Sequence, residues 1–206
     1  MKRNLVWPSV LMVVVFWLSR WPGLMPPNFS AAYALLFCAG LYWPGAAGWI
    51  GPLAVLAVSD GVITPLFYHL HDFSWGRFII DQSPNYLAYA GLIALGRLMG
   101  GKKPWWMLVG GGLAGAILFY LVTNSISWLT LSYSKTLAGW IQALTRGMPG
   151  HPPTWEFFRN TLSSGGLFTG LFVGAMKMTE DSEAQEEEEE DEEEREEDGE
   201  TAEAET

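Results

Sequence analysis

The chain has 206 residues, half of them apolar, with 11 Trp, 7 Tyr and 11 Phe, and its net charge is -10. Eighteen of its 22 acidic residues lie from Glu180 onward, where Arg195 is the one base, so residues 1–179 hold 11 bases against four acids. So few charged side chains exclude an ordinary soluble globular domain and indicate a membrane protein. We expect a membrane domain at 1–179 and a disordered acidic tail at 180–206, which is too polar to bury apolar surface.

Six apolar stretches, separated by Pro, Gly or polar clusters, predict an all-α polytopic bundle of six transmembrane helices. They lie at about 5–20, 29–43, 47–68, 85–100, 105–123 and 159–177. An additional amphipathic helix is expected near 132–146, because apolar residues recur there at helical spacing. Gly147 and Pro149 form a helix stop after it.

The basic residues of the short loops predict the orientation of the bundle. With both termini in the cytoplasm, Arg20 and Arg77 lie in the short outer loops, and six bases lie on the inner side. These six are Lys2, Arg3, Arg97, Lys102, Lys103 and Lys177. We therefore expect a multi-pass protein of the bacterial cytoplasmic membrane, with its longer, more polar loops outside.

Asp60 is the most informative single residue of the membrane domain. In a helix that runs outward from residue 47 to 68 it lies roughly 12 Å below the outer end. An ionisable group at that depth costs about 2.5–3.5 kcal/mol, so it should face the bundle interior and have a partner. The sequence offers Asn28, Arg20 and the turn at 123–124 as partners. A ligand site and a structural hydrogen-bond anchor both remain open for Asp60.

Other motifs give little sign of catalysis. His69, His71 and Asp72 have the residue types of a metal site, although polar loop residues at the membrane surface explain them as well. Cys38 is the single cysteine, and it lies in an apolar context. The chain has no phosphate-binding loop, nucleophile elbow or zinc-protease motif, so we expect no enzyme activity, no cofactor, no bound metal and no nucleic-acid partner.

Three segments together resemble one bacterial membrane family. They are Pro-Pro-Asn-Phe-Ser at 26–30 with the apolar run 34–37, the segment 51–60, and the stretch from Thr-Asn-Ser at 123–125 to Trp-Glu-Phe-Phe-Arg-Asn-Thr at 155–161. That family is described as transport proteins of unknown function, and it is similar to the substrate-binding S components of energy-coupling-factor transporters. The resemblance covers about residues 20–177 and leaves out the acidic tail.

The resemblance implies a small-solute binding subunit of a membrane importer. Its partners would be the lipid bilayer, a vitamin-like or other metabolite, a transmembrane coupling subunit, and ATPase subunits that supply hydrolysis. A structural or assembly subunit of a larger membrane complex is the alternative, which glycine repeats such as Gly166, Gly170 and Gly174 also suit. The expected substrate-binding residues converge near the outer helix ends. They are Asn28, Asp60, Asn124, Lys135, Trp155, Glu156 and Arg159.

Overall fold

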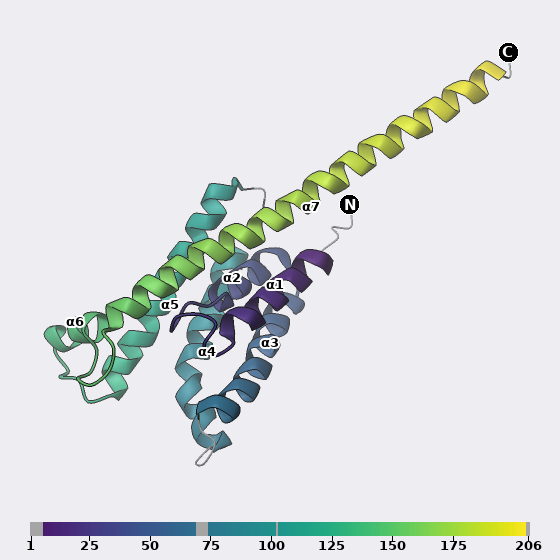
Figure 1. Cartoon of the computed structure of the whole chain (residues 1–206). Coiled ribbons are helices and arrows are strands. Elements are labelled where there is room, and N and C mark those ends of the chain that lie inside the picture. Colours follow the sequence, from purple (N-terminus) through teal and green to yellow (C-terminus); the bar gives the residue numbers. More distant parts are fainter. Residues whose placement is uncertain (1–5, 69–73, 102, 205–206) are drawn as a thin grey trace.

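Figure 1 shows the computed structural model of the chain, which describes residues 6–68, 74–101 and 103–204. The described part is all-helical, as the sequence predicts, and contains no strand. Its elements are α1 (Val6–Arg20), α2 (Ala32–Tyr42), α3 (Ala47–Ile63) with a π-helical extension η1 (Thr64–Tyr68), α4 (Trp75–Leu98), α5 (Trp105–Thr130), α6 (Leu137–Thr145) and α7 (Thr154–Ala204).

The six-span bundle is not confirmed, because among the described helices two are long and apolar enough to cross a membrane. These are Ala47–Phe67 and Trp105–Thr130. Helix α2 has 11 residues, and at 1.5 Å per residue it is about 16 Å long. A hydrocarbon core is about 30 Å thick, so α2 cannot cross it unaided.

Helix α2 is the centre of the molecule. Every residue from Ala32 to Gly40 is buried, and the helix packs against α1, α3, α4, α5 and α7. A helix that is apolar on all sides is expected in such a position, because no face of it has to meet water. The predicted span 29–43 therefore contains the core helix of this fold, at Ala32–Tyr42.

Two glycines allow α2 and α4 to pack backbone against backbone. A Cβ atom at Gly96 of α4 would meet the carbonyl oxygen of Phe37, and one at Gly40 of α2 would meet the carbonyl oxygen of Ile93. Both added carbons would lie well inside van der Waals contact with main-chain atoms. In a lipid bilayer, burial of apolar surface no longer drives helices together. Small residues at a crossing then favour association because they let the two backbones pack closely.

The glycine repeat of α7 has two different environments. A Cβ at Gly166 would lie 2.9 Å from the side chain of Leu113 on α5, whereas Gly170 and Gly174 face open space. The closest packing between α5 and α7 instead involves Gly112 of α5, where an added Cβ would collide with the side chain of Thr169, and Gly165 of α7, where it would lie 2.8 Å from Ala116. Only part of the predicted ridge therefore packs inside the described molecule.

Helix α6 lies where the sequence predicts an amphipathic helix. Thr136 caps its start by accepting a hydrogen bond from the N–H of Gly139 at 3.2 Å. After its end, Gly147 adopts a positive φ of 72° and donates to the carbonyl of Gln142 at 2.8 Å. This left-handed glycine terminates the helix as expected from the sequence.

Helix α7 has 51 residues and continues through the acidic segment to Ala204, whereas the composition predicts disorder there. Figure 1 shows this part extending away from the other helices. Its helical form has a physical reason: the packed first half supplies the costly helix nucleus, and Glu is a good helix former. At 1.5 Å per residue the whole helix is roughly 76 Å long.

The α2–α4 crossing gives a first prediction. Gly96→Ala should lower the free energy of unfolding by about 1–3 kcal/mol, because the new methyl group meets immobile backbone. Gly174→Ala is the matched control, since its added Cβ meets nothing within 4 Å and alanine is the better helix former. Unfolding of both variants in detergent measures the difference, and equal stabilities would contradict the tight crossing.

Candidate functional site

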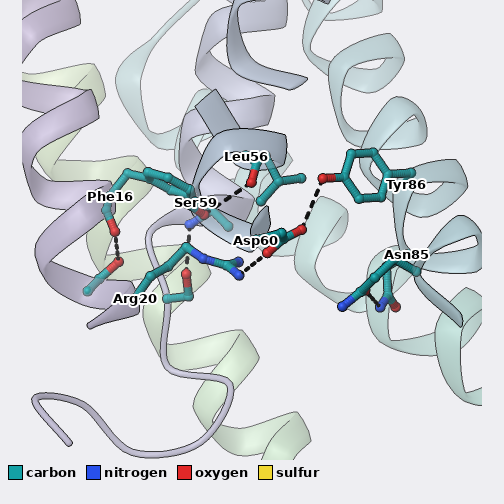
Figure 2. Close-up of polar contacts among 11 residues, drawn as sticks. Phe16, Arg20, Leu56, Ser59, Asp60, Asn85 and Tyr86 are labelled. Carbon is teal, nitrogen blue, oxygen red and sulfur yellow. Dashed lines mark hydrogen bonds and ion pairs between the residues drawn. The ribbon is translucent and has the colours of Figure 1, made fainter. Parts of the chain in front are cut away.

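The carboxylate of Asp60 on α3 is buried, with 3% of the residue exposed. Its Oδ1 forms an ion pair with the guanidinium of Arg20, the last residue of α1. Its Oδ2 accepts a hydrogen bond of 3.0 Å from the hydroxyl of Tyr86 on α4. Figure 2 shows Arg20 and Tyr86 approaching Asp60 from opposite sides. Asp60 thus faces the interior, and it is paired with Arg20, one of the partners predicted from the sequence. Its contacts join α1, α3 and α4.

Arg20 is held in place by apolar as well as charged contacts. Its guanidinium lies over the ring of Phe16, 5.6 Å from the ring centroid, and 20% of its side chain is exposed. Its Nε is buried and has no hydrogen-bond partner among the described residues. Removing one member of a buried ion pair leaves an uncompensated charge, which is why the two side chains depend on each other.

The loop between α1 and α2 folds over this ion pair. Ser19 ties its two ends together, because the Ser19 hydroxyl donates to the carbonyl of Phe16 and accepts from the N–H of Ala31, each at 2.8 Å. Asn28 has a positive φ of 61°, a backbone conformation that asparagine tolerates better than most residues. The loop is therefore fixed at its base and turns sharply near its centre.

Helix α7 holds the middle of the same loop. The amide of Asn160 donates to the carbonyl of Pro27 at 2.9 Å. The ring of Phe29 packs edge-on against Phe168, with the ring centroids 5.8 Å apart. These contacts couple the loop to the N-terminal part of α7, between Asn160 and Phe168, so the position of the loop depends on the position of that helix.

A cavity of about 850 Å³ lies beneath the loop and includes the ion pair. This volume is within the range of small-molecule sites. The α1–α2 segment supplies most of the lining, α3 and η1 supply three residues, and α4 supplies three. The lining comprises 19–23, 25–30, 32–33, Asp60, Ile63, Thr64, Gln82, Asn85 and Tyr89.

Aromatic side chains form one wall of the cavity. Tyr33 and Tyr89 both line it and both pack against Phe119 of α5, with ring centroids 4.9 and 4.8 Å apart respectively. The Tyr33 hydroxyl donates to the carbonyl of Asn28 at 3.4 Å. The wall therefore combines apolar ring faces with hydroxyl groups, which is the usual composition of a small-molecule site.

Two of the seven predicted site residues line this cavity. Asn28 belongs to the loop and Asp60 to the ion pair. The other five are not among its lining residues, although all lie on segments near the same end of the bundle. They are Asn124, Lys135, Trp155, Glu156 and Arg159.

The predicted residues outside the cavity include three whose contacts show local roles. The Lys135 ammonium donates to the carbonyl of Leu131 at 2.8 Å and caps the C-terminal end of α5. Asn124 donates to the carbonyl of Tyr120 one turn earlier, at 2.8 Å. Arg159 lies over the ring of Trp155 at 5.4 Å. These contacts account for the three polar side chains without a ligand.

Sequence reasoning missed the contribution of α4. This helix begins at Trp75, ten residues before the predicted span, so Gln82, Asn85 and Tyr86 were assigned to a loop or a span end. Their spacing with Tyr89 follows one face of a helix, and that periodicity is the signal that could have found them. Asn160, which holds the loop, was missed because nothing local links it to Pro27.

Two other features have no established place in this site. His69, His71 and Asp72 lie outside the described residues, so the metal hypothesis for them stays untested. A second hollow, of about 700 Å³, is lined by α6 and the turn after it, between Ala138 and His151. This second hollow is lined by one continuous segment, whereas the cavity beneath the loop is lined by residues from several helices.

The ion pair gives a second prediction. Arg20→Gln should destabilise the fold by about 3–5 kcal/mol, because it leaves the Asp60 carboxylate buried without a counter-charge. Arg20→Gln/Asp60→Asn removes both charges and should recover most of that loss. Unfolding free energies of the single and double variants in detergent form the cycle. Additive losses would show that the two charges do not depend on each other.

Comparison with protein families matches residues 2–187 to the family of unknown function DUF6580, and the chain belongs to this family. Comparisons with curated proteins and with solved structures find no significant match.

Proposed function

We propose that this DUF6580 chain is the solute-binding subunit of a small-molecule importer in the cytoplasmic membrane, without catalytic activity of its own. The observation that carries the proposal is the cavity beneath the α1–α2 loop, which encloses the buried Arg20–Asp60 pair at one end of the helical bundle. Ligand sites are typically concave and mostly apolar, with a few converging polar groups, and this cavity has that composition.

The outer surface of the bundle supports membrane insertion. Large apolar side chains are exposed along several helices, including Val10 on α1, Ile50 on α3 and Leu167 on α7, at 57%, 67% and 59% respectively. Exposed apolar surface on this scale is unusual for a soluble monomer and is covered by lipid in a membrane protein. The two helices long enough to cross a bilayer agree with this.

The proposed mechanism follows that of the S components of energy-coupling-factor transporters. The solute enters from the outer face, the α1–α2 loop covers it, and movement of the subunit against a transmembrane coupling subunit releases it inside. ATP hydrolysis is assigned to separate ATPase subunits. In support, the loop is held by contacts to α7 through Asn160 and Phe29, so movement of α7 would open or close the cavity.

A structural or assembly subunit is the second candidate. One face of α7 favours it, because Leu167, Leu171 and Met178 are exposed at 59%, 45% and 68%, and Gly170 and Gly174 between them leave open space. Such a face suits a closely packed neighbouring helix. The cavity has no role in this candidate function, and that difference separates the two.

A bound solute is the third prediction. Protein purified gently from its own membrane into lipid nanodiscs should retain a small metabolite that native mass spectrometry detects. Asp60→Asn should weaken its binding at least tenfold, about 1.4 kcal/mol, whereas Asp81→Asn should leave it unchanged because Asp81 is 66% exposed. Retention of stoichiometric protein partners without any small molecule would favour the structural candidate.

Orientation is the fourth prediction. The cavity lies at the end of the bundle where α1 and α3 finish, and Lys103 lies at the opposite end, just before α5. With the positive end inside, a thiol reagent should label His151→Cys in intact cells and Lys103→Cys only after permeabilisation. Wild-type protein is the control, because its Cys38 is buried. The reverse labelling pattern would place the cavity on the cytoplasmic side.

A further inference from the structure

The charges around the cavity cancel. Among the described residues that line it, Arg20 and Asp60 carry charge, and they are bound to each other. The Asp60 carboxylate uses its second oxygen to accept from Tyr86, and the Nε of Arg20 is itself buried. A charged solute would therefore lose hydration without meeting a free counter-charge, which is a large cost.

Several lining hydroxyl groups are already engaged. Ser19 both donates and accepts within the loop base, Ser30 accepts from the N–H of Ala32 at 3.1 Å, and Tyr33 donates to Asn28. The O–H donors of Ser19 and Tyr33 are thus used within the protein, which reduces what these hydroxyls can offer a ligand. Recognition must therefore rely mainly on other polar groups.

A pair of polar lining side chains that are bonded to each other belongs to α4. Gln82 and Asn85 both line the cavity, and the Asn85 amide nitrogen donates to the Gln82 carbonyl oxygen at 2.6 Å. They lie three residues apart, on neighbouring positions of one helix face. A head-to-tail pair of carboxamides always keeps one free NH2 group and one free carbonyl, whichever way the two amide planes are turned.

We propose that the cavity selects a net-neutral, planar solute that carries a hydrogen-bond donor next to an acceptor, as in a lactam or a primary amide on a ring. The donor and acceptor of this group match the free carbonyl and NH2 of the Gln82–Asn85 pair. Its ring lies against the Tyr33 and Tyr89 wall, where aromatic faces favour flat partners. This inference rests on the proposed solute-binding function and names the chemical class of its substrate.

The test uses a metabolite extract of the cells that produce the protein, divided by ion exchange at pH 7 into neutral, anionic and cationic fractions. Each fraction is added to the full chain in lipid nanodiscs, and the shift of its melting temperature is measured. Three proteins with changed side chains are compared with wild type. They are Gln82→Leu/Asn85→Leu, the isosteric Asn85→Asp, and the control Gln185→Leu on the exposed part of α7.

The neutral fraction should stabilise the wild type and the Gln185→Leu control equally. In Gln82→Leu/Asn85→Leu and in Asn85→Asp the affinity for the stabilising compound should fall at least tenfold. The melting temperature without ligand should stay within a few degrees of wild type in Asn85→Asp, which keeps the shape of the side chain. Mass spectrometry of the bound compound should find a neutral ring with an N–H beside a carbonyl.

Other results separate this inference from the proposed function. Stabilisation by an anionic or cationic fraction alone would overturn the neutral-solute inference and leave solute binding intact. Stabilisation by the neutral fraction that persists in both α4 variants would overturn the role of the carboxamide pair. Absence of stabilisation by every fraction, together with no retained metabolite, would overturn the proposed function and this inference with it.

Discussion

The close crossing of α2 and α4 is the constraint on which the other elements depend. Gly40 and Gly96 let the two backbones touch, and this contact fixes α4 against a helix that is buried on all sides. The N-terminal half of α4 then passes the ends of α1 and α3, where it presents Tyr86 to Asp60 and Gln82 with Asn85 to the cavity. The polar site is thus positioned by an apolar contact several turns away.

The packing of α4 against α2 places Asp60 in the interior, and the burial of its carboxylate in turn restricts how the surrounding helices can be arranged. A carboxylate that is 3% exposed stays ionised only where other groups replace the water it has lost. Arg20 from α1 and Tyr86 from α4 do so, so α1, α3 and α4 must meet around one side chain. The α1–α2 loop, which starts at the residue after Arg20, is consequently anchored where the charge is, and the space beneath it becomes a cavity.

The sequence predicts the helices better than the way in which they associate. Apolar stretches and stop signals such as Gly147 locate the cores of the described helices, because these signals are local, but they miss the early start of α4 and the continuation of α7 through the acidic segment. The composition of 29–43 does not distinguish a membrane span from a core helix, and its burial as α2 depends on five neighbouring helices. Asp60 and Asn28, which line the cavity, are predicted as site residues because they lie near the outer ends of the helices. Gln82, Asn85 and Asn160 are not, because their roles arise from the early start of α4 and from the pairing of α7 with a distant loop.

Cys38 lies on the central helix with none of its surface exposed. A thiol in that position reacts with water-borne reagents only after the helices around α2 have separated, because reaction requires access to the sulfur. The molecule therefore contains its own reporter of core opening, whose labelling rate measures the fraction of time that the core is open. Since the chain has no other cysteine, this signal comes from one position at the centre of the fold.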